Sequence, residues 1–128
     1  MTHFRFVKSK NICLKLLHLN EITADKEIQL TSSDWSTFSP ELDFDLILAS
    51  ECTYSESSYE KFHQVLEQNS SKNSKTKILI SMKNHYFGPG GSLKSWENFV
   101  KLKGIFSFEV VEKIDGCLPR FVVLMEKI

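Results

Sequence analysis

Polar and aromatic side chains follow two apolar segments of the chain, at the points where each segment gives way to a loop. Glu51 and Tyr54 come directly after "FDLILAS", and "KNHYFGPGG" comes directly after "KILISM". Both segments are short, apolar and bounded by polar residues, which predicts buried strands rather than helices. In open α/β sheets, ligands bind in the crevice at the carboxyl ends of the strands. The two loops are therefore the first place to expect function.

These residue types offer several kinds of chemistry, each with a plainer structural alternative. The carboxylate of Glu51 can accept a hydrogen bond from a ligand N–H, and it can share a pocket with Tyr54 if the turn between them is helical. Glu51 can equally lie near a helix start, where its charge is favourable. Asp34 and Trp35 end the segment "EIQLTSSDW". An Asp before a Trp also suits a turn beside a core aromatic.

The glycine-containing loop has the same two interpretations. Its glycines allow the backbone to turn closely past a bound peptide. Alternatively, His85 is an exposed polar residue, and Tyr86 and Phe87 cover the core. "GPGG" before a helix also suggests phosphate binding, but Leu93 stands where a G-x-G-x-x-G pattern requires glycine, so the sequence argues against a nucleotide phosphate.

The elements that must position these loops follow an α/β order. The hydrophobic patterns predict alternating strands and helices that end in an antiparallel hairpin, which indicates a mostly parallel sheet with an antiparallel edge. The expected strands are residues 4–7, 27–35, 44–51, 77–82, 106–114 and 120–128, and the expected helices are residues 11–22, 52–68 and 92–104, with Gly104 as a C-terminal cap.

Three motifs in this order resemble the protein-histidine methyltransferases related to methyltransferase-like protein eighteen. They are "SSDW", "FDLILASECTY" and "SMKNHYFGPGG", and the resemblance runs from about Ile28 to the C-terminus. It implies the C-terminal part of a Rossmann-like, seven-stranded methyltransferase sheet that uses S-adenosylmethionine. It also implies a protein substrate, namely a histidine of a large-subunit ribosomal protein.

The resemblance assigns roles to ten residues of this chain. Glu51 and Tyr54 would be catalytic, with Glu51 holding one nitrogen of the substrate imidazole. The implied cofactor-binding residues are Asp34, Trp35, Ser50 and Glu51, of which Asp34 and Trp35 would hold the adenine. The implied substrate-binding residues are Tyr54, Lys83, His85, Tyr86, Phe87 and Gly88.

The N-terminal part departs from the family pattern. Relatives begin with a strand and a glycine-rich turn at the cofactor, whereas the first glycine here is Gly88, and Lys8 or Ser9 aligns where relatives carry an acidic residue for the ribose. We therefore expect residues 1–128 to form a single, incomplete methyltransferase-like domain that binds the cofactor poorly by itself. The alternative to an enzyme is a truncated or degenerate non-catalytic form, either a binding module or a gene-model fragment.

Composition limits the partners and the setting. The 16 basic and 16 acidic residues cancel, so no overall field draws the chain to nucleic acid or to an anionic membrane, and the apolar runs are too short to span a bilayer. The three cysteines are widely spaced and the remaining histidines lack metal-ligand spacing, so neither disulfides nor a metal site is expected. We expect reduced thiols and a cytoplasmic or nuclear location.

Overall fold

The computed structural model describes the chain except for residues 1, 4–6, 22–29, 32, 39–43 and 72–74. The chain divides into two compact units, Met1–Phe38 and Ser39–Ile128.

The first unit combines two short parallel strands with a helix. Strand β1, Thr2–His3, pairs in parallel with β2, Leu30–Thr31, and helix α1 spans Val7–Leu19. The predicted helix at residues 11–22 is confirmed but begins earlier, because Val7 already belongs to α1. The predicted strand at residues 4–7 is wrong at Val7, and its other residues lie outside the described part of the chain.

The second unit is built on a four-stranded sheet in the order β3-β4-β6-β5. Strands β3 and β4 pair in parallel, whereas β4 with β6 and β5 with β6 pair antiparallel, so the predicted C-terminal hairpin is confirmed. The strands are β3, Leu46–Ser50, β4, Lys77–Lys83, β5, Glu109–Ile114, and β6, Arg120–Glu126.

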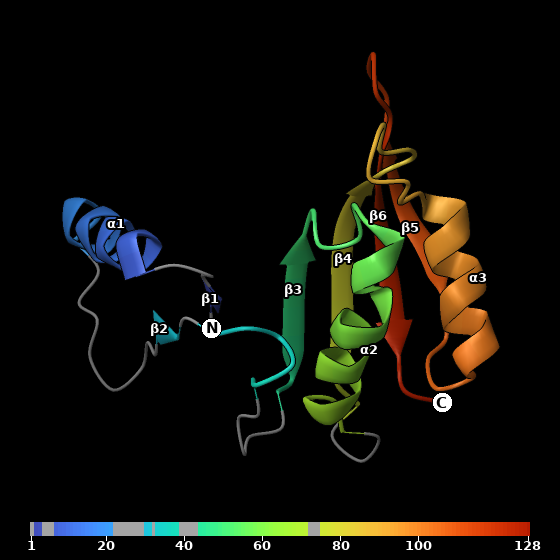
Figure 1. The fold of residues 1–128 in the computed structure, drawn as a ribbon, viewed down its shortest axis with the longest axis horizontal. Coiled ribbons are helices and arrows are strands. Elements are labelled where there is room, and N and C mark those ends of the chain that lie inside the picture. The colour runs from blue at the N-terminus through green and yellow to red at the C-terminus, as the bar shows by residue number, and fades with distance from the viewer. Residues whose placement is uncertain (1, 4–6, 22–29, 32, 39–43, 72–74) are drawn as a thin grey trace. The chain divides into compact units, whose positions relative to one another are not determined.

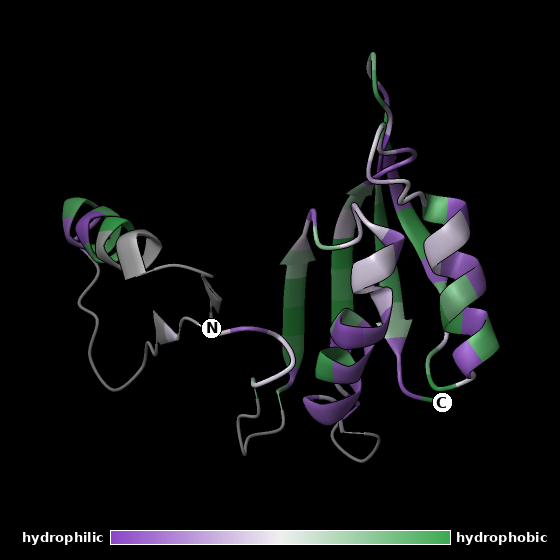
Figure 2. Ribbon diagram, in the orientation of Figure 1, coloured by the Kyte–Doolittle hydropathy of each residue, from purple (hydrophilic) through white to green (hydrophobic). Residues whose placement is uncertain are grey.

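Two helices cover one face of this sheet (Figure 1). A 3-10 turn, η1, at Glu56–Ser58 leads into α2, Tyr59–Gln68, and α3 spans Leu93–Lys103. Hydrophobic residues run along β3 and β4, while α2 turns hydrophilic residues toward the viewer (Figure 2). The core between the helices and the sheet contains Phe62, Leu66, Ile78, Ile80, Met82, Trp96, Val100, Val123 and Met125.

Helix α3 has well-defined ends that fix where the preceding loop stops. The Ser92 side chain accepts a hydrogen bond from the Ser95 backbone N–H at 3.0 Å, completing a capping box. Gly104 ends the helix in the left-handed conformation, φ 67°, as the sequence predicts. The helix buries Trp96 and Val100, whereas its apolar residue Leu102 is exposed.

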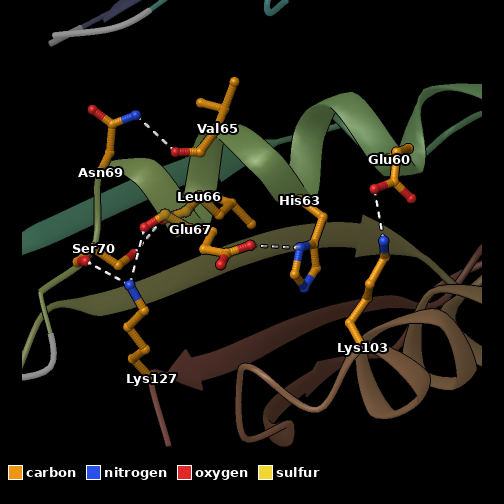
Figure 3. Close-up of polar contacts among 9 residues, drawn as sticks. All are labelled: Glu60, His63, Val65, Leu66, Glu67, Asn69, Ser70, Lys103 and Lys127. Carbon is orange, nitrogen blue, oxygen red and sulfur yellow. Dashed lines mark hydrogen bonds and ion pairs between the residues drawn. The ribbon is translucent and has the colours of Figure 1, made fainter.

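Lysine side chains from other elements of the unit contact helix α2 near both of its ends (Figure 3). Near its start, Lys103 Nζ lies 2.6 Å from Glu60 Oε1. At its end, Lys127 Nζ donates to the carbonyls of Glu67 and Ser70, each at 3.2 Å. A cation at a helix C-terminus satisfies carbonyls that lack partners within the helix and is favoured by the helix dipole.

His63 lies in the core of this unit rather than on its surface. Its side chain is 2% exposed, and its ring packs edge-on against Phe99 and Phe106. Nδ1 lies 3.9 Å from Glu67 Oε2, and Nε2 has no hydrogen-bond partner among the described residues. Burial lowers the pKa of His63, and the opposing pull of the Glu67 carboxylate is too weak to reverse the shift.

We expect the free energy of unfolding to fall as the pH drops below about 6.5, the ordinary pKa of histidine. The lowered pKa of folded His63 means that the unfolded chain binds this proton more tightly, so acid favours unfolding, whereas above that pH both states are neutral. Urea unfolding followed by circular dichroism between pH 5 and 8 would measure the effect. His63→Leu should flatten the acid slope, while His18→Gln on the surface of α1 should not; equal slopes for His63→Leu and the parent chain would refute the prediction.

Candidate functional site

The carboxyl ends of β3 and β4 meet at one edge of the sheet, as their sequence patterns predict. Ser50 pairs with Ser81, and the Glu51 backbone N–H donates to the Ser81 carbonyl at 3.1 Å. Glu51 then takes a left-handed conformation with φ 57°, which costs an L-residue of order 1 kcal/mol or more. The turn between Glu51 and Tyr54 is therefore not helical, so the condition stated for a shared pocket of these two side chains is not met.

The Glu51 carboxylate lies between two cations. Arg120 Nη1 donates to Oε1 at 2.7 Å, and Lys83 Nζ lies 3.9 Å from Oε2. Arg120 opens β6, directly opposite Lys83 at the end of β4. Since only Oε1 accepts a short hydrogen bond from these cations, and a carboxylate offers about four acceptor positions, the group retains capacity for a ligand donor.

Tyr86 completes this arrangement. Its side chain is buried, its hydroxyl oxygen accepts a hydrogen bond from the Lys83 backbone N–H at 3.0 Å, and Lys83 Nζ lies 5.5 Å from its ring centroid. Burial raises the pKa of Tyr86 to about 12, helped by the Glu51 carboxylate, while the Lys83 N–H and Arg120 act in the opposite direction. We call Glu51, Lys83, Tyr86 and Arg120 the Glu51 cluster.

The glycine-containing loop closes on the segment that follows β3. Its two ends meet where His85 bridges Ser92, and the Gly91 backbone N–H donates to the Tyr54 carbonyl at 3.1 Å. A Cβ on Gly91 would lie 2.2 Å from the Thr53 carbonyl oxygen. Here the glycine permits close approach to the chain's own backbone, a reason that differs from the predicted passage of a bound peptide.

The residues predicted to bind substrate divide into buried and exposed groups. Tyr86 is buried, as in the core interpretation, whereas Phe87 is 76% exposed and its ring meets that of His85 at 4.9 Å between centroids. Tyr54 is 44% exposed, and Gly88 turns the exposed loop with φ 89°. The loop therefore presents aromatic side chains to solvent beside the Glu51 cluster.

Asp34 and Trp35 belong to the first unit. The Asp34 carboxylate accepts hydrogen bonds from the Ser36 backbone N–H at 2.9 Å and from its hydroxyl at 2.6 Å, and the Thr37 N–H donates to the Asp34 carbonyl at 3.0 Å. Asp34 thus has the turn-forming role that the plainer interpretation describes, and Trp35 is partly buried. Ser50, the remaining predicted cofactor residue, is exposed at the end of β3.

Sequence reasoning missed Arg120. It lies 69 positions from Glu51, after a turn with glycine and proline, and no local spacing marks it. The antiparallel register of β6 against β4 brings it to the site, and only strand pairing could have revealed this.

Two kinds of feature are absent from the described part of the chain. It contains no group of three or more His, Cys, Asp or Glu side chains placed to hold a metal ion. None of its helices is long and apolar enough to cross a membrane.

Comparison with protein families and with individual proteins identifies methyltransferases in both cases. Residues 7–101 match the model of a family described as lysine methyltransferase. The histidine protein methyltransferase 1 homologs of Rattus norvegicus and Mus musculus are 36% and 37% identical over 76% and 64% of this chain. The chain spans only 28% and 22% of the lengths of these relatives. The predicted resemblance is thereby confirmed.

Solved structures agree on the fold. The N-methyltransferase NodS from Bradyrhizobium japonicum WM9, in complex with S-adenosyl-L-homocysteine, matches 98% of this chain and 64% of its own with a TM-score of 0.74 at 9% identity. The methyltransferase domain of bacterial CtHen1-C matches 98% of this chain and 75% of its own with a TM-score of 0.69 at 16% identity. The fold is that of Rossmann-like methyltransferases, and the match over residues 7–101 shows that the chain belongs to the lysine methyltransferase family.

Proposed function

We propose that this chain is part of an S-adenosylmethionine-dependent methyltransferase that acts on a histidine of a protein substrate. The observation that carries the proposal is the placement of Glu51, a partly exposed carboxylate at the carboxyl end of β3, beside an exposed aromatic loop. The names of the relatives and the methyltransferase fold support the same reaction class.

Methyl transfer to a histidine ring depends more on the orientation of the reactants than on acid–base catalysis. When bound, S-adenosylmethionine supplies the methyl group as a sulfonium: the C–S bond breaks with its electron pair going to sulfur, and an N–C bond forms to the ring. A histidine with a pKa of about 6.5 is largely neutral at pH 7, so the lone pair of its ring nitrogen is available. Orientation of the ring is then the main contribution to the rate. Glu51 would accept the N–H of the other ring nitrogen, fixing which nitrogen reacts and stabilising the charge that the ring gains.

The second unit offers suitable groups for this role. Glu51 keeps acceptor capacity besides its bond to Arg120, so it can contact the cofactor as well as orient the substrate ring. Ser50 is an exposed hydroxyl at the same strand end, and we assign it to the cofactor. Cofactor binding by Asp34 and Trp35 stays a prediction from the sequence, as does weak cofactor binding by residues 1–128 alone.

We assign the exposed loop to the protein substrate. Phe87, His85 and Tyr54 offer aromatic area of the kind that protein interfaces favour, and Lys83 adds a positive charge. The resemblance of "SMKNHYFGPGG" to the protein-histidine methyltransferases is the basis for proposing a large-subunit ribosomal protein as target. A cytoplasmic or nuclear location is part of the same proposal.

A lysine acceptor is the second candidate, because the matching family is described as lysine methyltransferase. A lysine ε-ammonium must lose its proton before methylation, and Glu51 is the carboxylate at this strand end that could receive it. The two candidates therefore share the site and differ in the modified residue.

Amino-acid analysis of the product would test the proposal. The longest natural form of the protein that contains residues 1–128 would be incubated with methyl-labelled S-adenosylmethionine and unmethylated large ribosomal subunits, and the labelled protein would be hydrolysed. Methylhistidine is the expected product, and methyllysine would establish the second candidate. Substrate capture without label transfer would indicate the non-catalytic binding module. Calorimetric titration of residues 1–128 with the cofactor would show whether this part binds it alone.

A further inference from the structure

We propose that Arg120 is a positioning residue, which holds the Glu51 carboxylate in the orientation that the substrate needs. The inference rests on the proposed function for the role of Glu51, but its geometric basis is independent of that function. The guanidinium of Arg120 makes the shortest contact of the Glu51 carboxylate, 2.7 Å to Oε1.

The register of β6 against β4 places two positive charges next to each other, and a nearby carboxylate can offset their repulsion. Lys83 and Arg120 are direct partners in the antiparallel β4–β6 pair, so their side chains emerge on the same face of the sheet. Like charges directly opposite each other destabilise a strand pair. Glu51 approaches both cations from the end of β3, so the three groups act as one unit.

The two cations act on Glu51 in different ways. Arg120 offers a planar guanidinium that makes a directed hydrogen bond, whereas Lys83 Nζ, at 3.9 Å from Oε2, lies beyond hydrogen-bond distance and acts as a point charge. A charge attracts the carboxylate without fixing its plane. The directed bond from Arg120 therefore sets the orientation of Glu51 and keeps Oε2 toward Lys83.

Stability alone gives little reason for this contact. Arg120 is 46% exposed and Glu51 36% exposed, and ion pairs at that exposure add little to stability. The left-handed backbone of Glu51 is itself unfavourable, so the fold maintains a strained residue and a directed contact at the same place. A role in holding the carboxylate accounts for both features.

Tyr86 provides a readout that does not depend on activity. Burial raises the pKa of its hydroxyl to about 12, and the Glu51 carboxylate adds to this shift. The charged groups that act on this hydroxyl are Glu51, which raises the pKa, and Arg120, which lowers it; the Lys83 backbone N–H also lowers it. Arg120→Lys keeps the positive charge but removes the planar donor. If Arg120 positions Glu51, this variant should weaken the influence of the Glu51 carboxylate on the Tyr86 hydroxyl, and the pKa of Tyr86 should fall below its parent value of about 12 while burial keeps it above that of a free tyrosine.

The test combines this titration with kinetics. Tyrosine ring carbons in residues 1–128 would be followed by NMR in the parent chain, in Arg120→Lys and in Glu51→Gln, which should show the same fall. In the longest natural form, Arg120→Lys should lower kcat roughly 10- to 100-fold while the KM for S-adenosylmethionine changes less than about threefold, as expected when a reacting geometry is lost.

Lys113→Gln is the matched control, because Lys113 forms an exposed ion pair with Asp115 at 3.2 Å on the same hairpin. It should change neither the pKa of Tyr86 nor kcat. A parent-like kcat or a parent-like Tyr86 pKa in Arg120→Lys would overturn the proposal. If the parent protein transfers no methyl group, the proposed function fails, and the titration still decides whether Arg120 positions Glu51.

Discussion

Glu51→Gln should lower kcat for methyl transfer roughly 100-fold in the longest natural form of the protein, while the dissociation constant for S-adenosylmethionine changes less than about threefold. Glutamine keeps the shape of the side chain and one acceptor oxygen but loses the charge that would stabilise a cationic ring. An interaction made chiefly at the reacting centre lowers turnover more than ground-state binding. Single-turnover rates and calorimetric titration with the cofactor would measure the two quantities separately.

Glu56→Gln is the appropriate control for this prediction. Glu56 is an exposed carboxylate in η1, five positions further along the chain, and it should tolerate the change. Circular dichroism would verify that Glu51→Gln stays folded, since losing a partly exposed ion pair costs at most about 1 kcal/mol. Parent-like turnover, or a loss of cofactor affinity equal to the loss of turnover, would show that Glu51 does not orient the substrate.

Gly91→Ala should destabilise the second unit by about 3 kcal/mol, the largest stability effect that we expect from a single methyl group here. The added Cβ would lie 2.2 Å from the Thr53 carbonyl oxygen and 2.6 Å from the Tyr54 carbonyl group. Both neighbours are backbone atoms, and the Gly91 N–H is bonded to the Tyr54 carbonyl, so relief requires moving the loop. Chemical denaturation would give the change in the free energy of unfolding.

Gly116→Ala offers a control of the same chemistry. Gly116 lies in the turn between β5 and β6, and the nearest atom to its added Cβ would be the Leu118 carbonyl oxygen at 4.0 Å. Gly116→Ala should change the free energy of unfolding by less than about 1 kcal/mol. Equal effects of the two substitutions would mean that the loop adjusts freely and that the close approach at Gly91 is not a constraint.

Local patterns were sufficient for most elements of the second unit. Short apolar runs bounded by polar residues located β3 and β4, an apolar stripe with helical period located α2, and Gly104 marked the end of α3. These signals are local because the repeat of a helix or a strand is set by its own backbone geometry. The strand-end motifs also identified the family, since each motif is contiguous in the sequence.

Neighbours distant in the sequence decided what these patterns left open. Tyr86 and Phe87 are adjacent aromatics with the same local signal, yet one is buried against the sheet and the other is 76% exposed. Leu102 is an apolar residue of α3, yet its side chain is exposed to solvent. Burial depends on which element covers a side chain, and neither composition nor period specifies that element.

The sequence by itself determined the class of fold and the family, and it predicted a site at the carboxyl ends of β3 and β4. Only the tertiary structure decided what surrounds Glu51: a left-handed backbone, a buried tyrosine, and a guanidinium from a strand 69 positions away. The physical reason is strand register. Because pairing of β6 with β4 is fixed by hydrogen bonds and packing along the whole hairpin, the position of Arg120 is a property of the sheet and cannot be inferred from the residues next to it.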